Sequence, residues 1–204
     1  MGGLTPAEKQ QRRTEAAKHK AYNNADLTWL VKMVTDMTSA LKLKGGNPTL
    51  AIGYYSPADE IWLCTKGAGT KEKLVEAADD NRPLSKVKSQ ILTTDTKGGN
   101  FENMHAEMQI VNNVVRKHDL NYKTQLATNL VIACGPNKHV CMDCCGWMAR
   151  KNIPHGVTCG ERVDQGWRHP ITKAGFRGDG PGLQYTKLTK KDKDEDDEKE
   201  SMSD

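Results

Sequence analysis

The chain has 204 residues, enough for one domain with a full hydrophobic core. It contains no stretch of about 18 apolar residues, which excludes a membrane-spanning helix, and its amino terminus lacks the apolar segment of a signal peptide. Residues 190–204 carry −4 in a chain of net charge +4, which leaves +8 on residues 1–189. A body this basic suits a polyanionic partner such as nucleic acid, although a solvated basic surface fits the charge equally well.

Hydrophobic spacing and turn residues divide the chain into a polar leader over residues 1–25, a folded domain over 26–188 and an acidic, disordered tail over 189–204. Helical spacing predicts helices over residues 26–44, 71–78, 84–92, 104–118 and 141–152, the first of them capped by Asp26. Short β-rich runs predict strands over residues 49–55, 60–65, 127–134, 155–159 and 183–188, with a hairpin loop at 56–59.

The order of these elements predicts an α/β fold with helices on both faces of a mixed five-stranded sheet. The third and fourth strands should be parallel because a helix connects them in a right-handed crossover. No helix is visible between the fourth strand and the fifth, so we expect the last strand to be antiparallel. The predicted architecture is therefore a three-layer α/β/α sandwich.

Two short motifs contain the candidate chemistry. His105 and Glu107 open one predicted helix, and Cys141 and Cys144 open another. One imidazole and two thiolates are three ligands for zinc, which leave the fourth tetrahedral position open for water. Both sulfur atoms lie on one side of their helix, whose amino terminus lowers thiol pKa values. Glu107 is not placed to be a fourth ligand, and we expect it to move protons.

Neither motif is decisive alone, since a lone C-x-x-C also occurs in closed zinc knuckles and in redox pairs, and a histidine at a helix start is often only a cap. Cys145 or Cys134 could supply a fourth ligand and make the site a closed, structural one. The two motifs together, each opening a helix, favour a catalytic zinc. Cys64 and Cys159 fall inside predicted strands and are expected in the core, and Cys145 is expected to be packed.

Through His105, Glu107, Cys141 and Cys144 the chain resembles the cytidine-deaminase-like superfamily over roughly residues 26–188, although Val140 stands where the family signature has proline. The resemblance implies a three-layer cytidine-deaminase-like fold, bound zinc and hydrolytic deamination of a nucleobase. The antiparallel last strand is similar to the branch that contains free-nucleoside deaminases and the deaminase domains of bacterial polymorphic toxins. Histidine as the first ligand and the missing proline are more similar to the toxin-type members.

Five residues are candidates for substrate binding. Asn100 and Asn103 lie in a segment similar to the one before this helix in nucleoside deaminases, although asparagine in a glycine-rich loop is commonly a turn residue. Tyr55, Trp167 and Arg168 are aromatic or basic side chains of the kind that stack on bases and hold phosphates. Scattered loop aromatics also fasten a loop to its domain.

The expected function is a zinc-dependent deaminase acting on cytosine in single- or double-stranded DNA or in RNA; adenine as the target stays open. Two alternatives also stay open: a deaminase of free nucleosides or nucleotides, and a non-catalytic zinc module that binds nucleic acid. Zinc-binding thiols must stay reduced, so we expect a cytoplasmic site of action, in its own cell or in a target cell, and no membrane partner. A toxin-type member is also expected to have an immunity protein as partner.

Overall fold

The computed structural model describes residues 25–43, 49–66, 71–94, 104–136, 140–156 and 169–171. The helices in these residues are α2 (Ala25–Ala40), α3 (Lys71–Asn81), α4 (Ala106–His118) and α5 (Met142–Arg150). The strands are β1 (Thr49–Tyr55), β2 (Glu60–Lys66), β3 (Gln90–Thr93), β4 (Leu130–Cys134) and β5 (His155–Gly156). Three short 3-10 turns are η1 (Ser56–Ala58), η2 (Leu84–Lys86) and η3 (Ala127–Asn129).

The five strands form one mixed sheet in the order β3-β2-β1-β4-β5. β1 lies at the centre and is antiparallel to both of its neighbours, β2 and β4. β3 is parallel to β2, and β5 is parallel to β4. The parallel β4–β5 pair, whose strands flank α5 in the chain, confirms the predicted strand-helix-strand unit.

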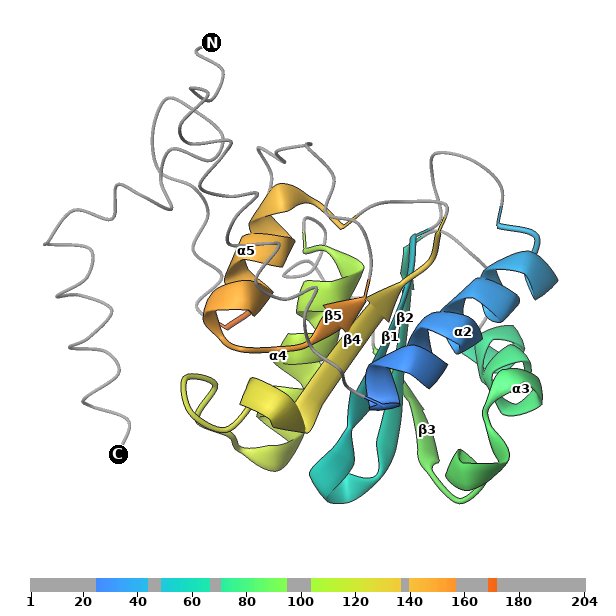
Figure 1. The fold of residues 1–204 in the computed structure, drawn as a ribbon, viewed down its shortest axis with the longest axis horizontal. Coiled ribbons are helices and arrows are strands. Elements are labelled where there is room, and N and C mark those ends of the chain that lie inside the picture. The colour runs from blue at the N-terminus through green and yellow to red at the C-terminus, as the bar shows by residue number, and fades with distance from the viewer. Residues whose placement is uncertain are drawn as a thin grey trace, which may run out of the picture.

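Side chains alternate along β1 and separate two apolar cores. Leu50, Ile52 and Tyr54 pack in the core that contains α2 and α3, whereas Ala51 and Tyr55 pack in the core that contains α4 and α5. Figure 1 shows the resulting arrangement, with α2 and α3 on one face of the sheet and α4 and α5 on the other. The predicted three-layer α/β/α architecture is confirmed.

The close packing of α4 on the centre of the sheet depends on a missing side chain. Gly53 of β1 faces α4, and a Cβ atom at this position would lie 2.7 Å from Cγ2 of Ile110. A distance this short is not compatible with van der Waals contact, so only glycine lets the helix approach the strand so closely. This approach places the start of α4, with the N-cap residue His105 and with Glu107 in the first turn, against the sheet.

A buried carboxylate fixes the opposite end of α4. Glu60 of β2, whose side chain is 4% exposed, accepts a hydrogen bond from Lys117 Nζ at 2.6 Å and another from Trp62 Nε1 at 3.0 Å. His118 Nε2 lies 2.8 Å from the second carboxylate oxygen. Burial raises the pKa of Glu60, but the hydrogen bonds from these three side chains outweigh it and hold the pKa below its ordinary value. Glu60 therefore anchors α4 to the β1–β2 hairpin as an ionised group.

The helix predicted over residues 84–92 is wrong, because this segment forms the η2 turn and then β3. A helix there would have been expected to bury Leu84 and Val87, yet these side chains are 91% and 53% exposed. The backbone N–H of Gln90 instead donates to the carbonyl of Asp59 at 3.0 Å, which starts the pairing with β2. A four-residue strand is stabilised by its neighbour in the sheet, and local spacing does not reveal it.

Other differences between the predicted and the observed elements concern where these elements begin and end. α2 begins at Ala25, so Asp26 lies in its first turn and is not its cap; its carboxylate accepts a hydrogen bond from Trp29 Nε1 at 3.0 Å. The strand predicted over 183–188 lies outside the described residues, as do residues 1–24 and the acidic tail. The described sheet still has five strands, the number predicted, because it contains β3, which was not predicted. No helix in the described part of the chain is long and apolar enough to cross a membrane.

Candidate metal centre

His105 stands at the start of α4 as its N-cap residue, with an extended backbone (φ −67°, ψ 155°). Its carbonyl oxygen accepts a backbone hydrogen bond from Gln109 at 2.9 Å, the first bond of the helix. The imidazole does not cap the helix. It lies instead against the two cysteines at the start of α5.

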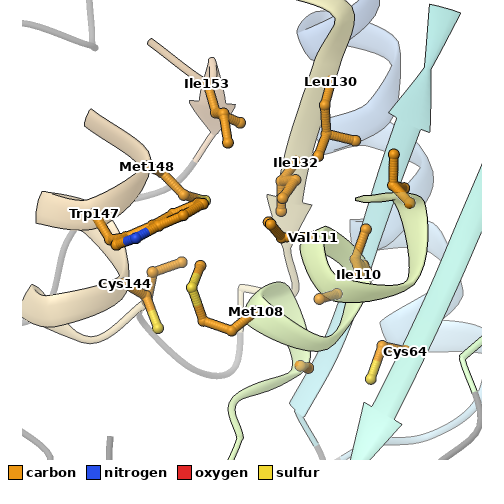
Figure 2. Packing of buried hydrophobic residues seen from close by; sticks show 14 of the residues in the cluster. Cys64, Met108, Ile110, Val111, Leu130, Ile132, Cys144, Trp147, Met148 and Ile153 are labelled. Atoms are coloured by element: carbon orange, nitrogen blue, oxygen red, sulfur yellow. The ribbon is translucent and has the colours of Figure 1, made fainter. Parts of the chain in front are cut away.

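Cys141 is the N-cap residue of α5, and its Sγ atom accepts a hydrogen bond from the backbone N–H of Cys144 at 3.3 Å. This local contact brings the two sulfur-bearing residues into one turn at the helix amino terminus, where negative charge is favoured. Cys144 is fully buried and belongs to the core between α4 and α5. Figure 2 shows it in this core with Met108 of α4 and with Trp147 from the next turn of α5.

The two helices bring the three predicted ligands together. His105 Nδ1 lies 3.3 Å from the Sγ atom of Cys141 and 3.3 Å from that of Cys144. The three donor atoms all lie within 4.8 Å of one another. Tetrahedral zinc, with bonds of about 2.3 Å to sulfur and about 2.0 Å to nitrogen, places such donors about 3.5 Å apart. The cluster therefore has the donor chemistry and nearly the spacing that zinc requires.

Two neighbouring cysteines differ in the direction of their pKa shifts. The pKa of the Cys141 thiol falls from 9.0 to about 7, chiefly because Cys144 hydrogen-bonds to it; burial opposes the shift and His105 adds to it. Burial raises the pKa of Cys134 well above its ordinary value, and the nearby charges of Glu107, Cys64 and Cys141 add to this rise. Cys141 is thus prepared to act as a thiolate ligand, whereas Cys134 remains a thiol.

Glu107 lies in the first turn of α4, and its side chain is buried, with 3% of the residue exposed. Its negative charge raises the pKa of Cys141 and of Cys134, so the carboxylate is close enough to influence both sulfur atoms. It is not one of the three grouped donors. A buried carboxylate beside a metal cluster, but outside its ligand set, is suited to hold and transfer a proton.

Neither of the cysteines considered as a fourth ligand joins the cluster. Within the described ranges, the only group of histidine, cysteine or acidic side chains close enough to hold a metal is His105, Cys141 and Cys144. Cys145 is buried, as predicted, and is disulfide-bonded, so it has no free thiol for a metal. Cys134 ends β4 and is held as a neutral thiol. The described residues therefore provide three ligands for a metal such as zinc, which leaves its fourth coordination position open.

Sequence reasoning missed two buried residues beside the ligands. Gln109 donates a hydrogen bond from Nε2 to the carbonyl of Met104 at 2.9 Å, and its Oε1 accepts one from the Cys64 thiol at 3.4 Å. Asp143, between Cys141 and Cys144 in the chain, is also buried in the first turn of α5. The signal that could have found Gln109 is a polar residue at a buried position of an amphipathic helix.

The structure does not bring Tyr55 to the cluster. Tyr55 pairs with Leu130 at the start of β4, whereas Cys134 at the other end of β4 pairs with Ala51. The Tyr55 ring packs on His118, the last residue of α4, with 4.8 Å between centroids. Thirteen residues of helix, about 20 Å, separate that end from the ligand end. Tyr55 is therefore not part of the candidate site.

Four further residues are predicted substrate contacts. Asn100, Asn103, Trp167 and Arg168 lie outside the described residues. Cys159, predicted to be a core residue, also lies outside them.

Comparisons with models of known protein families, with curated proteins and with solved structures found no match to this chain. The chemistry of the site is therefore inferred from its own residues. These form a potential zinc site with three protein ligands and a buried carboxylate beside it.

Proposed function

We propose that this protein is a zinc-dependent hydrolytic deaminase that converts cytosine to uracil in DNA or RNA. The observation that carries the proposal is the pairing of a three-ligand cluster with Glu107, a buried carboxylate two residues after the histidine ligand. A closed structural site has no need of such a carboxylate, because four protein ligands complete the coordination. The His-x-Glu and Cys-x-x-Cys patterns resemble those of zinc deaminases, which supports the same reaction.

Zinc held by His105, Cys141 and Cys144 would supply Lewis-acid chemistry, which lowers the pKa of water toward neutrality. In the overall reaction a C4–O bond forms and the C4–N4 bond breaks, so that cytosine and one water give uracil and one ammonia. One proton of the water ends on ring N3, and the other ends on the departing amine. Glu107 is the group that takes each proton and returns it, which a single carboxylate can do in two steps.

A polynucleotide is favoured over a free nucleoside by charge. Residues 1–189 carry +8, and phosphate contacts dominate the affinity of proteins for nucleic acids. A nucleoside has no phosphate to use this charge, and a nucleotide has only a few. The placement among toxin-type members, and with it an immunity protein as partner, stays a prediction from the sequence patterns.

The proposal is tested by incubating zinc-loaded protein with a mixed-sequence single-stranded oligonucleotide, its duplex form, the RNA equivalent and free nucleosides. Products are scored by mass spectrometry for C-to-U and A-to-I conversion. We expect uracil in at least one polynucleotide. Conversion of free cytidine alone would establish the free-nucleoside alternative. No conversion in any substrate, with one zinc bound per chain, would favour a non-catalytic zinc module.

A further inference from the structure

We propose that the hydroxyl group of Thr94, the residue directly after β3, is a contact for the sugar of the nucleotide whose base is deaminated. This inference deepens the proposed function and rests on it, because it assigns a substrate contact to the same site. Three observations carry it: the burial of the hydroxyl without a partner, its position beside the start of α4, and the face of the sheet on which it lies. Nucleotide binding and thermal stability test it without any turnover.

The Thr94 hydroxyl is a buried polar group without a hydrogen bond. Only 3% of the residue is exposed, and its Oγ1 atom has no hydrogen-bond partner among the described residues. The backbone N–H of Thr94, by contrast, donates to the carbonyl of Leu63 at 2.9 Å. An unsatisfied buried hydroxyl costs free energy in the folded protein, and a valine of nearly the same shape would avoid that cost. The hydroxyl is therefore suited to a partner that arrives with a ligand.

The pairing of β3 places the Thr94 side chain on the face of the sheet that α4 and α5 cover. The bond to Leu63 continues the parallel register of β2 and β3, which puts Thr94 beside Cys64. Cys64 belongs to the core that contains α4 and α5, and Leu92, two residues before Thr94, packs against that core. Because side chains alternate along an extended strand, Thr94 lies on the same face as Leu92.

The neighbour of Thr94 in the sheet is linked to a candidate metal ligand. The thiol of Cys64 donates to Oε1 of Gln109 at 3.4 Å. Nε2 of Gln109 donates in turn to the carbonyl of Met104 at 2.9 Å, and Met104 immediately precedes His105. Two side-chain contacts thus connect the residue beside Thr94 to the backbone that holds the imidazole. Thr94 therefore lies near the ligand end of α4, next to the residues that support it.

The structure of a cytosine nucleotide explains why the sugar would meet Thr94. C4, the atom that must reach the metal, lies across the ring from N1, which carries the sugar. A base at the cluster, between the starts of α4 and α5, therefore directs its sugar away from the ligands. β3 is at the opposite edge of the sheet from β5, the strand that follows α5, so Thr94 lies on the side of α4 away from α5. A hydroxyl both donates and accepts, so it can bond any sugar oxygen.

The depth of the site fits such a contact. Glu107, the proposed proton carrier, is as buried as Thr94, with 3% of each residue exposed. A base that reaches this carboxylate must enter the interior of the protein, as a base does when an enzyme takes it out of the stack. Its sugar is then drawn toward the layer between α4 and the sheet, where the Thr94 hydroxyl lies.

Thr65 provides a matched control in the neighbouring strand. Its Oγ1 atom is also buried without a partner in the part of the chain that the structure describes. Thr65 pairs with Leu50, which packs in the core that contains α2 and α3, so its side chain is on the opposite face of the sheet. Thr65→Val and Thr94→Val therefore remove the same kind of hydroxyl, but only Thr94 lies on the face of the metal cluster.

The test measures binding by Thr94→Val, Thr94→Ser and Thr65→Val. Each is made in a Glu107→Gln background, which blocks proton transfer, and the zinc-loaded proteins are titrated with fluorescent five-nucleotide DNA and RNA that contain one cytosine. We expect Thr94→Val to bind up to about tenfold more weakly, the value of one hydrogen bond, and Thr94→Ser to stay within about threefold of its parent. Thr65→Val should bind like its parent.

Thermal unfolding without nucleic acid tests the premise that the hydroxyl has no partner. Thr94→Val and Thr65→Val should each raise the melting temperature by about 2–4 °C, the shift that a small gain in stability gives in a chain of this size. A lower melting temperature for Thr94→Val, or failure of this variant to fold, would show that the hydroxyl bonds within the protein. Either result would overturn the proposal.

The remaining outcomes separate the contact from the enzymatic proposal. Weaker binding of RNA alone by Thr94→Val would identify the ribose 2′-hydroxyl as the partner, and an equal loss with DNA would identify an oxygen that both sugars share. Unchanged binding by Thr94→Val, or an equal loss in Thr65→Val or Thr94→Ser, would overturn the contact. Weaker binding by Thr94→Val alone, when the wild-type protein deaminates no substrate, would support the contact and reject the enzymatic proposal.

Discussion

The side-chain amide of Gln109 donates a hydrogen bond at 2.9 Å to the carbonyl oxygen of Met104, the residue immediately before the candidate ligand His105. The bond reaches back over the start of α4 and fixes the backbone from which the imidazole of His105 projects. The thiol of Cys64 in β2 donates to the other end of the amide at 3.4 Å and sets its orientation. One buried side chain thus connects the sheet, the helix and the candidate metal ligand.

Replacing Gln109 by glutamate should weaken zinc binding, because a carboxylate has no N–H to donate and repels the Met104 carbonyl. Loss of such a supporting contact typically costs about 10–100-fold in metal affinity. Competition with a chromophoric chelator measures the zinc Kd, and circular dichroism checks the fold. Gln125→Glu, at an exposed position outside this network, is the matched control. A Kd for Gln109→Glu equal to that of the control would show that Gln109 does not position the ligand.

Two cysteines offer a matched test of the ligand set. Cys144→Ala removes a grouped donor, whereas Cys134→Ala removes a buried thiol outside the group. We expect about one zinc per chain in the wild type and in Cys134→Ala, and a large loss in Cys144→Ala, because two ligands hold zinc weakly. Elemental analysis after dialysis gives the stoichiometry. Retention by Cys144→Ala together with loss in Cys134→Ala would require a different ligand set.

Features that depend on local pattern could be predicted from the sequence. The β1–β2 hairpin was evident because β-rich runs flank a turn, and α4 because its apolar residues recur at helical spacing. The three candidate metal ligands are predictable from residue type and from their positions at two helix starts. Their convergence in space is confirmed.

Features that depend on tertiary contacts could not be predicted. β3 has four residues, too few for a periodic signal, and its pairing with β2 defines it. The role of Gln109 follows from a backbone carbonyl that its side chain meets only in the folded protein. Tyr55 was an apparent substrate contact because it is aromatic and ends a strand, but that strand end lies away from the cluster.

The buried carboxylate of Glu60 should contribute stability that depends on pH. Because the folded-state pKa of Glu60 is lowered, its contribution is complete above the unfolded pKa and is lost as the pH falls through the folded pKa. Glu60→Gln should therefore lower the free energy of unfolding by about 2 kcal/mol at pH 7, and by less near pH 4 and below. Urea unfolding of both metal-free proteins at the two pH values measures the difference. A deficit that is independent of pH would contradict an ionised, hydrogen-bonded Glu60.

The close approach of α4 to β1 can be tested with two glycines. Gly53→Ala puts a methyl group 2.7 Å from Ile110 Cγ2 and should cost about 1–3 kcal/mol through overpacking. Gly146→Ala, in α5, places its methyl group 3.6 Å from Arg150 Nη1, an ordinary contact, and should stabilise the helix by up to about 1 kcal/mol. Thermal unfolding gives the two changes in sign and size. If the methyl group clashes with Ile110, Gly53→Ala should cost little stability when it is added to Ile110→Ala, because the clashing side chain is then absent. An equal cost in the Ile110→Ala background would contradict the proposed clash.

The most direct measurement of the central claim is the deamination rate of Glu107→Gln, determined together with its zinc content. The substitution keeps the size of the buried side chain and removes its ability to accept and return a proton. We predict unchanged zinc occupancy and a cytosine deamination rate lower by about 10²–10⁴-fold than that of the wild type. Near wild-type turnover by the zinc-loaded variant would contradict the account, and so would the absence of deamination by zinc-loaded wild-type protein on every nucleic-acid and nucleoside substrate.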